Sequence, residues 1–282
     1  MSKSKKYWGS AILKWLVMVS ALFTFAVLFF LIGHILINGL PHLSLDLFAL
    51  EYNTENVSMM PAIINTLTIT LLALAIAVPV GIFSAIYLVE YAKKGNRFVG
   101  LIQLTTETLS GIPSIVYGLF GMLFFVNTLK WRHSLLAGAF TVAIMVLPSI
   151  MRTTEEALKS VPDSFREGSF GLGAGKLRTV FRIVLPSAVP GIIAGVILAI
   201  GRIVGETAAL IYTAGTVAEI PDSIMDSGRT LAVHMYNLSN EALYMNQAYA
   251  TAVVLLVLVI GINTISSLVA KKLMKGNGNG EN

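Results

Sequence analysis

The stretch VSMMPAIINTLTITLLALAIAVPVGIFSAIYLV, residues Val57–Val89, contains no charged side chain. An α-helix crosses the apolar core of a bilayer with about 20 residues. The stretch is therefore long enough to span a membrane. Its apolar residues do not alternate with polar ones, as they would in the strands of a membrane barrel. The stretch therefore predicts a transmembrane helix.

The rest of the chain repeats this pattern. Hydrophobic residues make up 55% of the sequence and charged residues 12%, about half the charged share of a soluble domain. One of the runs is interrupted, by Arg202 and Glu206. The sequence thus predicts an all-α integral membrane protein with six transmembrane helices. The other five runs are Trp15–Ile37, Ile112–Leu129, Ser134–Met151, Ile183–Ala218 and Ala242–Ala270.

The charges in the connections predict the orientation. Lys and Arg gather before the first run, in the second and fourth connections, and after the last run, whereas the other loops hold mainly Asp and Glu. Lys130, Arg132 and Arg229 are the basic exceptions in those loops. Because basic loops stay in the cytoplasm, we expect both termini inside, with a cytoplasmic tail over 1–14, a transmembrane domain over 15–270 and a disordered tail over 271–282.

The composition also limits which kinds of chemical site the chain can contain. The chain has no cysteine, which excludes disulfides and thiolate metal sites. Its four histidines are scattered without metal-ligand spacing, so no metal site is expected. The modest basic excess follows from topology and does not indicate nucleic-acid binding.

The long inner connection, about residues 152–186, holds a helix signal. Ser160-Val161-Pro162-Asp163 is a capping-box pattern with proline in the first turn, and it predicts a helix over Asp163–Phe170. Glycines at 171, 173 and 175 should end this helix before a second one begins at 176. A helix lying crosswise between two membrane helices can contact a cytoplasmic partner, and an ordinary surface loop is the alternative.

The same connection contains GLGAGK, residues 171–176, which looks like a phosphate-binding loop. Phe170 stands where such a loop needs glycine, and Leu177 stands where Ser or Thr would bind magnesium. No buried strand precedes it. The chain is therefore not expected to hydrolyse ATP.

In the inner connection, Glu167-Gly168-Ser169 is followed after three residues by Gly173, and after nine more by Ile183-Val184-Leu185-Pro186. This spacing resembles the EAA loop of the membrane subunits of bacterial ABC importers, the binding-protein-dependent transport inner-membrane component family. The strict motif has two alanines where this chain has two other small residues, Gly168 and Ser169. The resemblance implies the type I permease fold, with 15–270 as the permease domain. It also implies a coupling helix seated on a cytoplasmic ATPase dimer, which binds the ATP and Mg, so that this chain is not an enzyme and holds no cofactor. The residues that the resemblance assigns to ATPase coupling are Glu167, Gly168, Ser169, Gly173, Ile183, Leu185 and Pro186.

Two further stretches resemble one branch of that family. Ser110–Gly118 (SGIPSIVYG) and Gly205–Ala208 (GETA) are similar to the permeases of phosphate-specific importers. The length, the short N-terminus and the context from Arg202 to Thr207 resemble the PstA type more than the PstC type. Ala209 stands where that branch often has proline. The resemblance therefore does not fix where the fifth helix bends. The resemblance implies an extracytoplasmic phosphate-binding protein, a second permease subunit (PstC-like or a copy of this chain), surrounding membrane lipid, and a bacterial or archaeal cytoplasmic membrane. The alternatives are a permease for another oxyanion, such as molybdate or sulfate, and a membrane-embedded transferase.

Arg202 and Glu206 are the charges deep in the fifth run. At i and i+4 on one helix they would share a face with Gly191 and Gly195. A charge at bilayer depth is costly, so we expect the pair to face a cavity or the bundle interior. Guanidinium donates to an oxyanion, and a carboxylate accepts the proton of hydrogen phosphate. A structural salt bridge is the alternative.

Arg202 and Glu206 are thus the main candidates for the substrate path through the membrane, and other polar groups are weaker candidates. Ser110 and Ser114 flank Pro113, which should break the third helix and free backbone donors. Glu107 is either a path residue or a helix-end group. Three further expectations are a solvated pair of Glu90 with Lys93 or Lys94, a pair of Arg152 with Glu155, and a short helix within 215–246.

Overall fold

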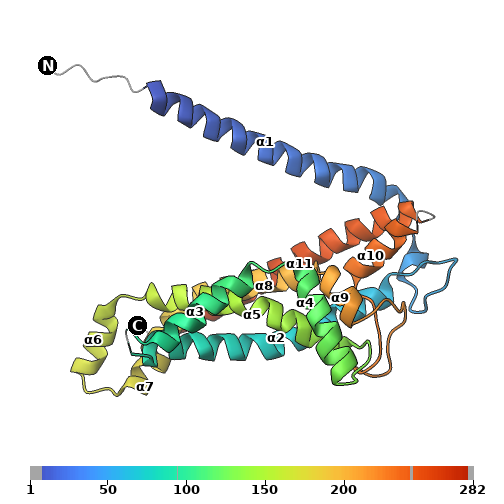
Figure 1. The fold of residues 1–282 in the computed structure, drawn as a ribbon. Helices are drawn as coiled ribbons and strands as arrows, with labels where there is room; N and C mark the ends of the chain where they lie inside the picture. The colour runs from blue at the N-terminus through green and yellow to red at the C-terminus, as the bar shows by residue number, and fades with distance from the viewer. Residues whose placement is uncertain (1–7, 94, 242–243, 279–282) are drawn as a thin grey trace.

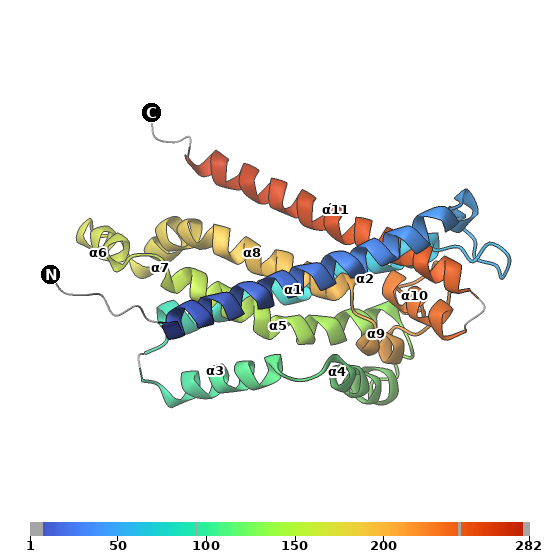
Figure 2. The same ribbon diagram turned by 90° about the horizontal axis from the view of Figure 1, so that it is seen from above.

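The computed structural model describes residues 8–93, 95–241 and 244–278, and these form a bundle of helices (Figures 1 and 2). Five helices are long and apolar enough to cross a membrane, and a bent pair gives a sixth span. The predicted helical membrane fold is thus confirmed. The α-helices are α1 Trp8–Gly39, α2 Met60–Ile86, α3 Arg97–Ser110, α4 Ser114–Gly121, α5 Leu135–Lys159, α6 Asp163–Gly171, α7 Lys176–Thr179, α8 Leu185–Val204, α9 Ala208–Thr213, α10 Leu231–Asn240 and α11 Met245–Gly278. Short 3₁₀ turns are η1 Leu40–His42 and η2 Leu45–Phe48, and π-helical turns are η3 Tyr87–Tyr91, η4 Met122–Thr128 and η5 Val180–Val184.

Helix α5 is the centre of the bundle and packs between α2 and α8. Its buried side chains, such as Val142 and Ile150, belong to the main hydrophobic cluster. Small residues on α8 allow a close approach, because a Cβ at Gly195 would overlap Thr153 and one at Gly191 would lie 2.7 Å from Ala157 Cβ. Helices α5 and α8 therefore pack closely at these two glycines.

Helix α1 stands away from the bundle (Figure 1). It contacts α11 near its C-terminal end, where Gly39 lies against the backbone of Tyr249. The apolar side chains along the rest of α1 are exposed. In a membrane this surface faces lipid or another apolar helix.

The two ends of the bundle carry different elements. Both views place α6, α7, the start of α1 and the end of α11 at one end, and α10 with the connection after α9 at the other (Figures 1 and 2). The inner connection therefore shares its end of the molecule with both ends of the described chain. The predicted short helix within 215–246 is confirmed as α10.

The third predicted span, Ile112–Leu129, corresponds to α4 and η4, and helix α3 precedes it. Helices α3 and α4 meet at a bend of 103° over Gly111–Pro113. Proline lacks an N–H group and disfavours a helical conformation in the residue before it. The Tyr117 hydroxyl donates to Leu109 O across the break, at 2.8 Å. The predicted break at Pro113 is confirmed.

The chain ends are more helical than predicted. Helix α1 begins at Trp8, inside the tail expected over 1–14, and α11 continues to Gly278, past Ala270. Lysine, leucine and methionine between 271 and 275 are good helix formers, so the helix extends beyond its apolar part. Residues 1–7 and 279–282 lie outside the described residues.

Candidate functional site

The fifth predicted span is broken at the GETA stretch. Helix α8 ends at Val204 and α9 begins at Ala208, with Gly205–Thr207 between them. The buried Glu206 carboxylate accepts a hydrogen bond from Ala209 N at 3.0 Å. A negative charge at the N-terminal end of a helix is favourable. Glu206 therefore stabilises the start of α9.

This break corrects the predicted geometry of Arg202 and Glu206. The two residues do not lie on one helix face, because α8 ends between them. Among the described residues, the ion pairs found do not include one between Arg202 and Glu206. The proposed structural salt bridge is thus absent from this conformation.

Arg202 lines a cavity of about 640 Å³ between α5, α8 and α11. Two polar side chains that sequence reasoning missed share this cavity with it, Ser149 of α5 and Asn263 of α11. The Asn263 Oδ1 atom is buried and has no hydrogen-bond partner. A guanidinium and an amide facing one cavity can together bind a ligand with several acceptor oxygens. The remaining lining residues are Ala194, Ile197, Leu198, Ala199 and Gly201.

The two broken spans pack on each other. A Cβ at Gly118 of α4 would lie 2.8 Å from Ala209 Cα of α9, so these helices touch through their backbones. The stretches SGIPSIVYG and GETA therefore meet in the fold. Ala209 is fully buried at this contact.

Ser110 and Ser114 are placed away from the Arg202 cavity. The Ser110 hydroxyl donates to Glu107 O at 2.7 Å, and neither serine lines that cavity. Ser110 thus satisfies a carbonyl at the end of α3. A path role for the two serines stays a prediction.

The inner connection forms the two predicted helices, α6 and α7. Ser169 is buried and its hydroxyl lies 2.8 Å from Thr179 Oγ1, which ties the two helices together. Gly173 has a φ of +82°, and its N–H donates to Phe170 O at 2.9 Å. The left-handed turn at Gly173 is what reverses the chain after α6.

Apart from the buried Ser169, the residues predicted for ATPase coupling fall into two groups. Glu167, Gly168 and Gly173 are exposed, whereas Ile183, Leu185 and Pro186 are half-buried where α7 runs through η5 into α8. Four large apolar side chains near the first group are also exposed, which is a surface suited to a protein partner. They are Phe165, Phe170, Leu172 and Leu177.

Three charged groups at the α6 end of the bundle have partners other than the expected ones. Glu90 pairs with Arg166 of α6, and Lys94 lies outside the described residues. Arg152 pairs with Glu156, one position beyond the predicted Glu155. Glu155 instead pairs with Lys159 and accepts a hydrogen bond from Gln103 Nε2 at 3.1 Å. Glu107 lines a shallow inner cavity with Arg152.

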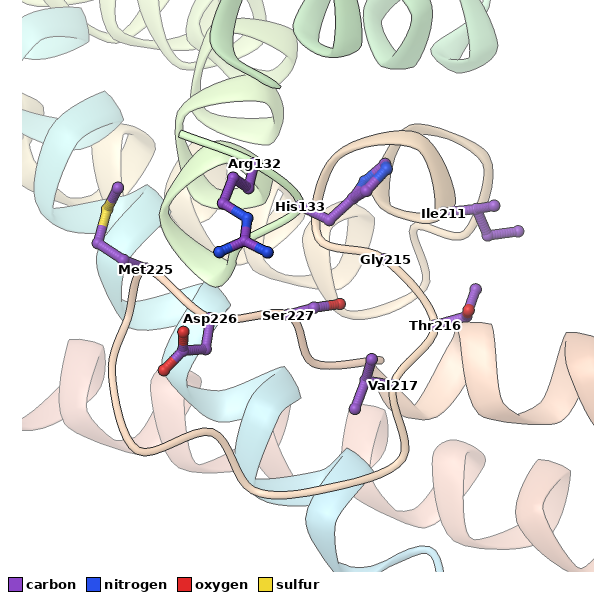
Figure 3. A pocket seen from close by; sticks show the side chains of 9 residues that line it. All are labelled: Arg132, His133, Ile211, Gly215, Thr216, Val217, Met225, Asp226 and Ser227. Carbon is purple, nitrogen blue, oxygen red and sulfur yellow. The ribbon is translucent and has the colours of Figure 1, made fainter. Parts of the chain in front are cut away.

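A second cavity, of about 420 Å³, lies at the end of the bundle opposite α6 and α7, between the start of α5 and the connection after α9 (Figure 3). Arg132 and Asp226 come from the two opposite segments. Lys130 and Arg132, two of the basic exceptions in the sequence, have positive φ values of 60° and 59°. The outer segment 223–228 is held to α5 by backbone bonds from Leu135 N to Asp226 O (3.0 Å) and Leu136 N to Ile224 O (2.9 Å).

An open cavity lined by an arginine on a helical membrane bundle, connected by one helix to a loop with exposed apolar side chains, is the arrangement expected of a membrane transport subunit that works with a partner. The chain belongs to the family of binding-protein-dependent transport system inner membrane components, whose model matches residues 77–275. Such a chain is a permease subunit of an ABC transporter and not itself an enzyme, and an ATPase and a substrate-binding protein are its partners.

Named relatives cover most of the chain. It is 34% identical over 233 residues to the probable ABC transporter permease protein YqgI of Bacillus subtilis, covering 77% of this chain and 79% of that protein. It is 37% identical over 205 residues to the phosphate transport system permease protein PstA of Mycobacterium leprae, with coverages of 72% and 67%. PstA of Haemophilus influenzae is 31% identical over 234 residues, 82% of each chain.

Solved structures share the fold. A chain of a bacterial importer of the acidic polysaccharide alginate superposes with a TM-score of 0.66 at 18% identity, covering 95% of this chain and 99% of that one. A chain of the inward-facing MetNI methionine transporter gives a TM-score of 0.59 at 18% identity, with coverages of 76% and 94%. The type I ABC importer permease fold is thus confirmed.

Proposed function

We propose that this chain is the membrane-spanning permease subunit of an ATP-driven importer for inorganic phosphate. It forms half of the translocation path, and a second permease subunit, PstC-like or a copy of this chain, forms the other half. Three relatives named as phosphate permeases, at 31–41% identity, support the substrate class. Both termini lie in the cytoplasm, on the side of α6 and α7.

The observation that carries the proposal is the cavity that Arg202 shares with Ser149 and Asn263. Hydrogen phosphate has several acceptor oxygens, and the guanidinium presents donors in a planar fork that matches them. The Asn263 amide adds two further donors, and the Ser149 hydroxyl donates or accepts. ATP-driven movement of the coupling loop would alternate access to this cavity from the two sides.

Replacement of Arg202 tests the path. Arg202→Gln should abolish phosphate uptake by the full complex while membrane insertion and assembly are retained. Arg202→Lys should keep partial uptake at best, because the ammonium lacks the planar fork. The double variant Arg202→Gln with Glu206→Gln should also be assembled but inactive. Recovery of uptake in the double variant would show that Arg202 only neutralises Glu206.

Asn263 offers a second test with a control on the same helix. Asn263→Ala should raise the KM for phosphate by roughly tenfold, the loss of about one hydrogen bond to a charged group. Thr264→Ala is the control, because the Thr264 hydroxyl donates to Ile260 O of its own helix at 2.7 Å. Equal KM values for the two variants would remove Asn263 from the site. Competition by molybdate or sulfate in the same assay distinguishes phosphate from the other oxyanions.

The coupling surface also belongs to this proposal. Glu167 and Gly173 should lie at the ATPase contact, beside the exposed side chains Phe170 and Leu172. A groove on the ATPase would cover these apolar groups, which are otherwise in water. The supporting observation is that a hydrogen bond between Ser169 and Thr179 joins the two arms of the loop at its base, while its tip is exposed.

A further inference from the structure

A nearly buried ion pair joins the coupling helix to the inner end of α2. Arg166 of α6 donates to Glu90 Oε1 of η3 from Nη2 at 2.7 Å and from Nε at 3.1 Å. The side chains are 15% and 8% exposed. Because guanidinium holds its donors in a fixed plane, this pair fixes the orientation of α6 as well as its distance from α2.

The same guanidinium also binds the end of α5. Nη2 donates to Leu158 O at 2.9 Å and Nη1 donates to Val161 O at 2.8 Å. Carbonyls at the C-terminal end of a helix lack partners within that helix. One side chain therefore connects α6 with two membrane helices.

Segment η3 has a contact with the second arm of the loop as well. The Lys176 ammonium at the start of α7 lies 5.1 Å from the centre of the Tyr91 ring, in the geometry of a cation–π contact. Segment η3 is a π-helical turn in which Ala92 N donates to Tyr87 O at 2.9 Å. Both arms of the coupling loop thus contact the same terminal turn of the α2 span.

The opposite end of α2 holds the outer connection. Asn65 Nδ2 donates to Glu219 O at 3.0 Å and to Arg229 O at 3.3 Å, and Thr66 Oγ1 accepts from Leu231 N at 2.8 Å. Helix α2 is continuous from Met60 to Ile86 and packs along α5. One continuous helix, with Pro79 inside it, therefore connects the coupling loop with the segment that lines the outer cavity.

We propose that Glu90 and Arg166 are positioning residues that pass movement of the coupling helix to α2 and through α2 to the outer connection 214–230. The proposal rests on the proposed function, since it describes how ATP hydrolysis by the partner would change access at the outer end. An ion pair of this kind transmits displacement in both directions, because its fork resists sliding as well as separation.

The test uses the complete complex in proteoliposomes, with the ATPase, the second permease and the binding protein present. The measured quantities are phosphate uptake, ATP hydrolysis and their ratio. Glu90→Gln should assemble and hydrolyse ATP, while uptake per ATP falls by roughly tenfold, a usual size for coupling between two sites. The single charge reversals Glu90→Arg and Arg166→Glu should each lower uptake per ATP. The double variant that carries both changes should restore part of that loss.

The exposed Arg152–Glu156 pair is the matched control, since it is also an Arg–Glu pair near the end of α5. Glu156→Gln should leave the ratio unchanged. Arg166→Lys keeps the charge without the fork and should give an intermediate ratio. A wild-type ratio for Glu90→Gln would overturn the proposal, and so would failure of both Glu90→Gln and Arg166→Lys to assemble, since the pair would then be a folding contact only.

The two proposals fail in different ways. If the wild-type complex hydrolyses ATP in response to its binding protein but takes up no phosphate, the proposed substrate is wrong. Stimulation of ATP hydrolysis by the binding protein then tests the ion pair, because that stimulation also crosses the membrane through the permease. Wild-type stimulation in Glu90→Gln would overturn the inference in that case.

Discussion

His234 shows how a single buried side chain makes stability depend on pH. It lies fully buried on α10, with its ring edge-on to Tyr52 and with Arg229 nearby. Burial, and second the Arg229 charge, lower the pKa of His234 to about 3. The folded protein therefore keeps this imidazole neutral at pH values where the unfolded chain protonates it.

We predict that the stability of the purified chain is greatest above pH 6.5 and falls as the pH drops from 6.5 towards 3. Between these values the unfolded state binds more protons, so the free energy of unfolding falls by up to about 1.4 kcal/mol per pH unit. Thermal unfolding in detergent at pH 7.5, 6 and 5 measures the slope. His234→Gln should flatten it, whereas the same change at exposed His42 should not. Equal slopes for both variants would contradict the assignment.

Glu206 also offers a test, because its carboxylate accepts a hydrogen bond from Ala209 N at the start of α9. Glu206→Gln keeps an acceptor oxygen and should keep the assembled fold, whereas Glu206→Ala should lower the stability of this region by about 1 kcal/mol, as for a lost helix cap. Hydrogen exchange of the α9 amides is the measurement. Unchanged exchange in Glu206→Ala would show that the bond to Ala209 N has no structural role.

The sequence identifies some site residues better than others. The sequence points to Arg202, because an arginine inside an apolar run costs free energy at bilayer depth. Asn263 was overlooked because an uncharged amide interrupts a run much less, although a polar group at bilayer depth is itself a signal. The relation of Arg202 to Glu206 could not be predicted, because it depends on where α8 ends, and local hydropathy does not report that.

At the scale of elements, the apolar runs and the proline and glycine positions predict most helices correctly. The bend at Pro113 and the helix α6 followed from local chemistry. The break after Val204 did not, because Gly205 and Glu206 are compatible with a continuous helix. Just after that break, Ala209 packs against Gly118, a tertiary contact that the local sequence does not report.

A substitution at Gly173 tests the turn that ends helix α6. A Cβ there would meet no atom within 4 Å, so any effect of substitution comes from the positive φ and not from a clash. Gly173→Val should strain the turn by about 1–2 kcal/mol and lower recovery of the ATPase with the permease. Gly171→Ala, also in open space but without a positive φ, is the control. Normal ATPase recovery and uptake in Gly173→Val would contradict the coupling assignment.

At the scale of the whole molecule, the proposed orientation rests on the basic connections and on the arrangement of the two ends. The chain has no cysteine, so a single introduced cysteine reports on one position without interference. Leu172 in the inner connection and Leu45 in η2 at the opposite end are 91% and 90% exposed, which makes them a matched pair for labelling.

We predict that a membrane-impermeant maleimide labels Leu45→Cys in intact cells and labels Leu172→Cys only in inside-out vesicles. Because the two side chains are equally exposed, a difference between them reports the side of the membrane and not local access. Addition of the ATPase should then protect Leu172→Cys and leave Leu45→Cys unchanged, since the partner covers the exposed tip of the coupling loop. Labelling of Leu172→Cys in intact cells would reverse the orientation, whereas labelling unaffected by the ATPase would place the partner contact elsewhere on the inner end.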